Sequence, residues 1–201
     1  MAKEYSCVKR TKKAFGTSLA ELSKEYPLHK VTVKLLCEKA ELSRNAFYFH
    51  YNDINDLVRD IEDNIINEIS KYFEEFKKLG FPDNVLATIK ALIDLFDRER
   101  ENVMMLFDKS YSITFTRRLM VMFSEFNYSY FKQYNPHASK TSYDLFYAFL
   151  SSGFYECLRL WLENSEAISK EDVTRITYKM IKRLLIPDDP DMERIIGAKK
   201  K

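Results

Sequence analysis

Glycine and proline are scarce in this chain of 201 residues, which contains four glycines and five prolines. Because these residues interrupt regular backbone structure, their wide spacing leaves long segments in which helices can run unbroken. Alternating apolar and polar residues, the pattern of half-buried strands, are missing, and so is any internal repeat. The sequence therefore predicts an all-α fold.

Cysteine is equally sparse, with Cys7, Cys37 and Cys157 far apart in the chain. Their odd number and wide separation argue against a disulfide framework and against a metal site built on a cysteine pair. No apolar run reaches the roughly 18 to 20 residues needed to cross a bilayer, and the first residues lack the apolar segment of a secretory signal. We expect reduced thiols, no bound metal and a cytoplasmic protein.

Motifs of catalysis are lacking as well. The sequence contains no GxGxxG, GxxxxGK[ST], HExxH or GxSxG pattern. Its three histidines, His29, His50 and His137, lie in different segments. We therefore expect no enzymatic activity and no cofactor.

Charge, by contrast, is plentiful and unevenly distributed. Residues 1–51 contain ten Lys or Arg against five Asp or Glu, whereas residues 52–201 contain 22 against 25. A basic first quarter suggests a surface for a polyanion, although an excess of five charges also occurs on ordinary solvated surfaces.

Apolar residues recur every three or four positions in a series of segments, as in amphipathic helices. Thr32 and Ser43 are good N-caps for two short helices. The predicted helices cover residues 6–25, 32–39, 43–49, 53–79, 84–100, 101–109, 114–133, 141–164 and 170–186.

The two short helices, separated by about three residues, have the spacing of a helix-turn-helix. The second one places polar groups outward near its start. Arg44 can donate to guanine O6 and N7, Asn45 can pair with adenine N6 and N7, and Ala46 can touch a thymine methyl. This pattern predicts binding to double-stranded DNA, with about three quarters of the chain left for other roles.

The block VTVKLLCEKAELSRNAFYFHYNDINDL resembles the helix-turn-helix of TetR-type transcriptional regulators over about residues 8–58. The resemblance implies that Phe47 and Tyr51 anchor the module, while Tyr48 and His50 approach phosphates. The resemblance and the outward side of the second helix together give these expected DNA contacts: Thr32, Lys34, Ser43, Arg44, Asn45, Ala46, Tyr48, Phe49 and His50.

Two positions depart from the family pattern. Glu41 stands where the family usually has a glycine in the turn, so a side chain must tolerate that backbone at some steric cost. Ile54 stands where a phosphate-binding lysine is often found, which removes one favourable charge.

The resemblance also implies a division of the chain. Residues 1–53 are expected to form a three-helix DNA-binding domain, residues 54–186 a larger helical effector-binding and dimerisation domain, and residues 187–201 a flexible tail. Residues 111–161 contain 15 of the 29 aromatic residues. Aromatic residues at helical spacing also fit an ordinary hydrophobic core, so a pocket and a packed core both remain open.

For a pocket, we expect polar groups from tyrosine hydroxyls, Arg117, Arg118 or Asn127. The candidate pocket residues are Phe107, Tyr111, Phe115, Phe123, Phe126, Tyr130, Tyr147 and Phe154.

The last two predicted helices carry apolar residues on more than one side, which suits a helix that serves its own core and a second subunit. The resemblance implies a four-helix interface in a homodimer. Its candidate residues are Phe149, Gly153, Ile176, Met180 and Leu184.

Together these features predict a transcriptional regulator, most simply a repressor that leaves a palindromic operator when an unknown small-molecule effector binds. The alternative is a coactivator or interaction protein of the same fold that acts through a protein partner. An enclosed cavity in the C-terminal part would favour the first, and a solid core with exposed aromatic residues would favour the second.

Overall fold

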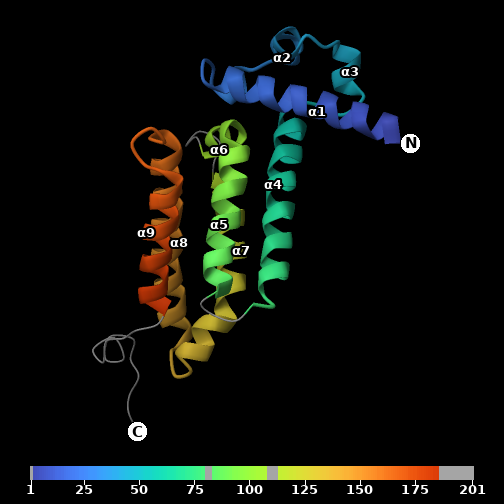
Figure 1. Ribbon diagram of the computed structural model, residues 1–201. Coiled ribbons are helices and arrows are strands. Elements are labelled where there is room, and N and C mark those ends of the chain that lie inside the picture. Colours follow the sequence, from blue (N-terminus) through green and yellow to red (C-terminus); the bar gives the residue numbers. More distant parts are fainter. Residues whose placement is uncertain (1, 80–82, 108–112, 186–201) are drawn as a thin grey trace. The chain divides into compact units, whose positions relative to one another are not determined.

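A computed structural model describes residues 2–79, 83–107 and 113–185, and within them the fold is all-α, as predicted (Figure 1). The described part contains no strand. Every predicted helix is present, with ends within a few residues of those expected. The elements are α1 (Ala2–Ser23), the 3-10 helix η1 (Leu28–Lys30), α2 (Val33–Ala40), α3 (Arg44–Tyr48), α4 (Ile54–Phe76), α5 (Asp83–Arg98), α6 (Arg100–Phe107), α7 (Ile113–Tyr134), α8 (Lys140–Glu163) and α9 (Lys170–Leu185).

The chain packs as two compact units. Unit 1 gathers the described residues of Met1–Glu68 and Glu99–Thr116, and unit 2 gathers those of Ile69–Arg98 and Arg117–Lys201. The packing unit around the helix-turn-helix is therefore larger than residues 1–53, because most of α4 and all of α6 join it. The division by function at residue 54 stays a prediction, and the tail predicted over residues 187–201 lies outside the described residues.

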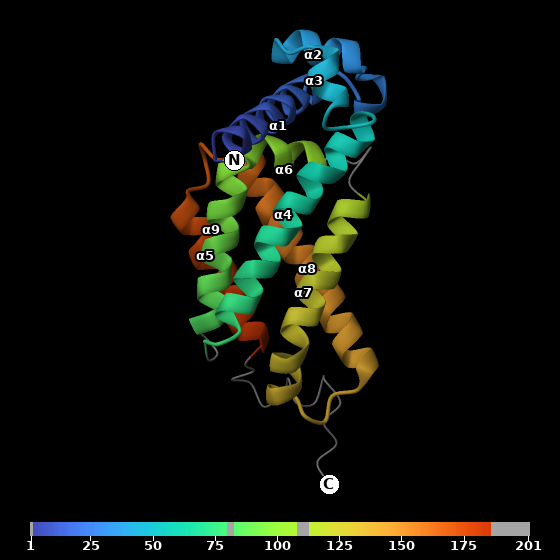
Figure 2. The ribbon, with the colours of Figure 1, turned by 90° about the vertical axis from the view of Figure 1, so that its right-hand side faces the viewer.

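Unit 1 is built around α1, which packs against α2 and α6 (Figure 2). The side chains of Phe15, Leu36 and Phe47 are completely buried between these elements. A salt bridge at the surface joins Lys24, the residue after α1, to Glu101 of α6. The short helices of the helix-turn-helix, which are too short to be stable alone, thus gain their stability from tertiary packing.

Unit 2 is a helical bundle in which α9 packs against α5 and α8. Lys170, at the start of α9, reaches Asp94 at 2.6 Å and Asp97 at 3.1 Å on α5. The only tryptophan of the chain, Trp161 on α8, is 2% exposed. Asn84 on α5 is fully buried, and neither of its side-chain amide atoms has a hydrogen-bond partner in the described structure.

Candidate functional site

The helix-turn-helix is formed by α2 and α3, and each helix begins at the N-cap predicted from the sequence. The Thr32 hydroxyl accepts a hydrogen bond from the Leu35 amide at 3.2 Å, and the Ser43 hydroxyl accepts one from the Ala46 amide at 3.1 Å. These side chains satisfy amides that have no partner within their own helices. The Ser43 cap thereby fixes the start of α3, and Arg44 and Asn45 are the first two residues of that helix.

The turn between the two helices depends on Glu41, which adopts left-handed backbone angles of φ 53° and ψ 37°. The Glu41 amide donates to the Glu38 carbonyl, and the Leu42 amide donates to the Cys37 carbonyl. This pair of bonds is the Schellman arrangement that ends many helices, usually with glycine at the left-handed position. Among the described residues other than glycine, Glu41 alone has a positive φ. The steric cost expected at Glu41 is therefore present, because a Cβ atom disfavours left-handed backbone angles.

The predicted DNA-contacting residues lie together at the surface of unit 1. Those exposed to solvent are Thr32, Lys34, Ser43, Arg44, Asn45, Tyr48 and Phe49, while Ala46 and His50 are partly exposed. A guanidinium, an amide and a methyl group that follow one another at the start of a helix are the groups that read base edges in the major groove.

The five consecutive rings of residues 47–51 divide between core and surface. Phe47 is completely buried and packs edge-to-face on Phe15, with ring centroids 5.4 Å apart. Tyr51 is 4% exposed, whereas Tyr48 is 58% and Phe49 is 78% exposed. This burial matches the predicted anchors and leaves two large rings facing solvent.

Tyr51 fixes the ring segment to two long helices. Its hydroxyl donates to the Asp60 carboxylate of α4 at 2.8 Å. The Lys12 ammonium of α1 contacts the same carboxylate at 3.2 Å and lies 5.3 Å from the centre of the Tyr51 ring. Burial, followed by the bond to Asp60, raises the pKa of the Tyr51 phenol far above its ordinary value. Tyr51 therefore stays protonated and keeps donating at any physiological pH.

His50 lies beside Phe49, with ring centroids 4.9 Å apart. Burial and then the positive charge of Lys12 lower the pKa of His50, against an opposing effect of Asp60. The imidazole is therefore biased toward its neutral form in the free protein.

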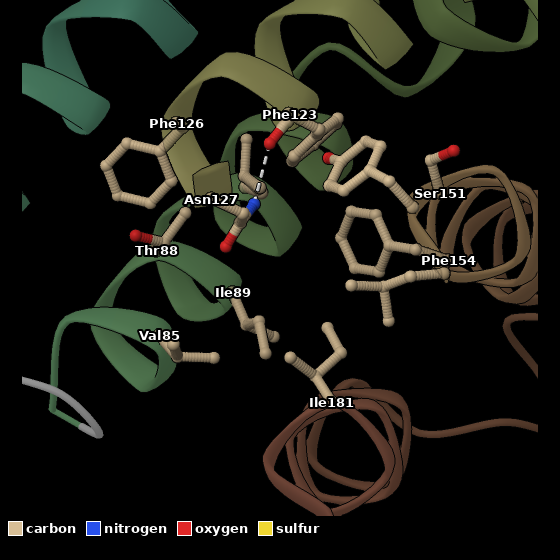
Figure 3. A pocket seen from close by; sticks show the side chains of 12 residues that line it. Val85, Thr88, Ile89, Phe123, Phe126, Asn127, Ser151, Phe154 and Ile181 are labelled. Carbon is tan, nitrogen blue, oxygen red and sulfur yellow. Dashed lines mark hydrogen bonds between the residues drawn. The ribbon is translucent and has the colours of Figure 1, made fainter. Parts of the chain in front are cut away.

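Unit 2 contains a partly open cavity between four helices (Figure 3). The space open to the centre of a water molecule is about 40 Å³, and the whole empty space, open mouth included, is about 450 Å³. The lining residues are Val85, Thr88, Ile89 and Leu92 of α5, Phe123, Phe126 and Asn127 of α7, Tyr147, Leu150, Ser151 and Phe154 of α8, and Ile181 of α9. A mostly apolar wall with a few polar groups is typical of small-molecule sites.

The aromatic part of this wall is held by ring contacts from α4. Phe73 stacks on Phe126, with centroids 4.3 Å apart and planes at 13°. The same ring meets Phe123 edge-on at 5.4 Å, and Phe123 meets Phe154 edge-on at 5.2 Å. These contacts hold three wall rings in defined orientations.

Comparison with known proteins identifies the family. A TetR-type family model described as a transcriptional regulator C-terminal region matches residues 83–183, half of the chain. The chain belongs to the TetR family of transcriptional regulators. No relative is found among curated protein sequences.

Solved structures of TetR-family proteins share the fold. A putative TetR-family regulator from Syntrophomonas wolfei is 14% identical with a TM-score of 0.69, over 90% of this chain and 98% of its own. NalD of Pseudomonas aeruginosa, the secondary repressor of the MexAB-OprM multidrug efflux pump, is 11% identical with a TM-score of 0.65, over 90% and 100%. The repressor FadR of Thermus thermophilus, solved with lauroyl-CoA, is 15% identical with a TM-score of 0.57, over 89% and 97%. At these identities the likeness shows the fold alone.

The structure brings together only some of the candidate pocket residues of this TetR-family protein. Four line the cavity: Phe123, Phe126, Tyr147 and Phe154. Phe107 and Phe115 instead pack against each other in unit 1, with centroids 6.0 Å apart. Tyr111 lies outside the described residues, and the side chain of Tyr130 is not described.

Other cavity residues were missed by reasoning from the sequence. Of the polar groups expected at a pocket, Asn127 lines the cavity, and Arg117 and Arg118 do not. The contributions of α5 and of Ile181 on α9 were not predicted. The signal for the α5 residues was the apolar periodicity of residues 84–100, which predicts a buried helix face but cannot say that the face borders an empty space.

A separate group of apolar side chains is exposed on α8 and α9. Phe149 is 71% exposed, Ile176 is 45% and Met180 is 54%. Gly153 is also exposed, and a Cβ atom added to it would meet nothing within 4 Å. Leu184 differs from the other interface candidates, because it is partly buried against the cluster of unit 2 that contains Phe131 and Tyr147.

The described ranges lack membrane-spanning helices and metal-binding clusters. None of the helices there has the length and apolar character that crossing a membrane requires. The same ranges hold no group of three or more His, Cys, Asp or Glu residues placed to bind a metal ion.

Proposed function

We propose that this TetR-family protein is a repressor that binds a palindromic operator as a homodimer and leaves it when a small molecule occupies the cavity of unit 2. The observation that carries the proposal is the capped start of α3, where Arg44 and Asn45 are exposed side by side. These side chains form bidentate pairs with guanine and adenine, respectively. Tyr48 and His50, one turn later, are suited to phosphate contacts that set the orientation.

Dimerisation follows from the size of the reading element. α3 has five residues, so one copy covers only a few base pairs. Two copies about 34–36 Å apart on one face of the duplex read both halves of a palindrome and sum their binding free energies. The exposed apolar face of α8 and α9, with Phe149, Ile176 and Met180, is the surface that we assign to the second subunit.

Effector control is supported by the cavity, which a coactivator acting through a protein partner would not need. The ring contacts suggest a route for the signal. Phe73 belongs to α4 and stacks on the cavity wall at Phe126, while Asp60 of the same helix holds Tyr51 and the ring segment. An effector that binds more tightly to one orientation of α4 than to another shifts the equilibrium by that difference in free energy.

The test is selection of bound fragments from genomic DNA by the purified protein at two salt concentrations, followed by measurement of subunit stoichiometry on the selected site. We expect a palindrome with half-sites about one helical turn apart, bound by a dimer or a pair of dimers. Binding that is independent of sequence and lost at the higher salt concentration would contradict the proposal.

A further inference from the structure

Among the described residues that line the cavity of unit 2, none has a charged side chain. An ionised ligand would therefore lose its hydration without gaining a counter-ion, and this loss is costly in an apolar site. Tyr147 is the one ionisable residue in the part of the lining that the structure describes. Burial raises the pKa of its phenol strongly, against a smaller lowering by a hydrogen bond with Asn127, so Tyr147 stays neutral.

The shape of the wall favours a flat apolar molecule. Phe123, Phe126 and Phe154 present ring surfaces whose orientations are held by contacts with Phe73 and with one another. The opposite side consists of aliphatic groups from α5 and α9, such as Ile89 and Ile181 (Figure 3). Rings gain more than aliphatic chains from such walls, because stacked and edge-on contacts add to the burial of apolar area.

The hydroxyls of Thr88 and Ser151 have no hydrogen left to donate to a ligand. The Thr88 hydroxyl donates to the Asn84 carbonyl at 2.7 Å, and the Ser151 hydroxyl donates to the Ala148 carbonyl at a longer 3.4 Å. Each hydroxyl has a single hydrogen, so both residues retain only acceptor positions.

Asn127 is oriented by its own helix. Its Nδ2 donates to the Phe123 carbonyl at 2.8 Å, and since a carbonyl can only accept, this bond fixes which end of the amide is nitrogen. The amide oxygen consequently lies on the other side, toward Ile89 and the cavity, as Figure 3 shows. Asn127 thus presents an acceptor oxygen to the cavity, and the neutral Tyr147 hydroxyl in the same lining can donate.

We infer that the effector is an uncharged, flat, mainly apolar ring molecule with one hydrogen-bond donor, such as a ring N–H or a hydroxyl, which binds the side-chain oxygen of Asn127. The inferred ligand class depends only on the cavity, whereas its role as an effector rests on the function proposed above. The room available to water centres, about 40 Å³, is that of a few water molecules. A ring ligand is larger than this room, so it has to move the side chains around the cavity apart, and it therefore prefers one state of unit 2.

The test uses two pairs of probes matched in shape, titrated into the full-length protein by calorimetry without DNA. Indole and benzofuran differ in the ring N–H donor, and indole-3-carboxamide and indole-3-carboxylate differ in charge. We expect indole to bind roughly tenfold more tightly than benzofuran, because benzofuran leaves a buried acceptor unpaired. We expect the carboxylate to bind at least a hundredfold more weakly than the carboxamide.

Two variants locate the donor site. Asn127→Leu keeps the number of side-chain heavy atoms but removes the acceptor, so indole and benzofuran should bind it equally. Asn135→Leu is the matched control, because Asn135 makes the same bond from Nδ2 to the carbonyl four residues earlier, at 3.2 Å to Phe131, and does not line the cavity. The control should keep the tenfold preference for indole.

Preferential binding of the carboxylate, equal binding of indole and benzofuran to the unchanged protein, or no binding of any probe would overturn the inferred ligand class. A separate titration of the complex with the selected operator distinguishes this failure from failure of the proposed function. If indole binds with the expected preferences but leaves operator affinity unchanged, the ligand class stands and the release mechanism falls. If operator binding is specific and no probe binds, the regulator stands and the ligand class falls.

Discussion

Replacing Glu41 by glycine should stabilise the protein. Glu41 holds left-handed backbone angles at the end of α2, where its amide and that of Leu42 close the helix. A residue with a Cβ atom pays roughly 1–2 kcal/mol for this conformation, which glycine adopts freely. Glycine, however, loses more backbone freedom on folding, at a cost of about 0.5–1 kcal/mol.

The difference between these two terms predicts that Glu41→Gly raises the free energy of unfolding by roughly 0.5–1 kcal/mol. For a protein of this size, a gain of about 1 kcal/mol corresponds to a rise of about 2–4 °C in the midpoint of thermal unfolding. The Glu41 side chain is exposed, so loss of its own contacts should change little.

Urea unfolding followed by far-UV circular dichroism measures the change. Glu41→Ala is the control, since it removes the same carboxylate but keeps the Cβ atom and with it the backbone strain. We expect the glycine variant to be more stable than both the natural protein and the alanine variant. Equal stability of the two variants, or a less stable glycine variant, would refute the reasoning that the left-handed turn is strained.

Four further predictions concern DNA, the subunit contact and the core. Arg44→Ala should cost roughly 1–3 kcal/mol of operator affinity and relax base preference, whereas Tyr48→Phe should weaken binding to all sites about equally; competition binding with altered operators separates the two. The lowered pKa of His50 in the free protein and the attraction of a nearby phosphate for the protonated form mean that DNA binding takes up a proton. Operator affinity should therefore rise as the pH falls toward the lowered pKa of His50 in the free protein, and His50→Gln should flatten that dependence. Phe149→Glu should place a charge on the proposed subunit interface and yield monomers in sedimentation experiments, and a dimer of unchanged affinity would reject this surface. Asn84→Leu should raise the free energy of unfolding by about 1 kcal/mol, because it replaces a buried amide that lacks partners by an apolar group with the same number of heavy atoms; urea unfolding would show a loss instead if the amide has an unseen partner.

The helices and the helix-turn-helix could be predicted because their signals are local. Thr32 and Ser43 cap helices with their own side chains, a property that is visible within four residues of sequence. In the ring segment, Phe47 and Tyr51 are buried and Tyr48 is exposed, as the resemblance implied. Local periodicity was therefore sufficient for the helices, whereas the burial pattern of the recognition segment was expected from the resemblance to TetR-type regulators.

The cavity could not be predicted in the same way, because it forms where side chains from helices far apart in the sequence leave a space unfilled. Phe115 and Phe126 look alike in the sequence, yet the first is completely buried in unit 1 and the second lines the cavity of unit 2. Ile181 lies 96 positions after Val85 along the chain, and no periodicity relates the two. The inclusion of α6 in unit 1 has the same cause, since it results from contacts with α1 that are far apart in sequence.

The burial of Trp161 within unit 2 gives the protein a built-in optical reporter. As the only tryptophan, it dominates the emission spectrum, and its position on α8 makes that emission sensitive to the bundle around the cavity and not to the helix-turn-helix. Circular dichroism, in contrast, averages over helices of both units. Coincident denaturation curves from the two signals would indicate that the units unfold cooperatively. Separated curves would indicate that each unit unfolds in its own transition, with its own free energy of unfolding.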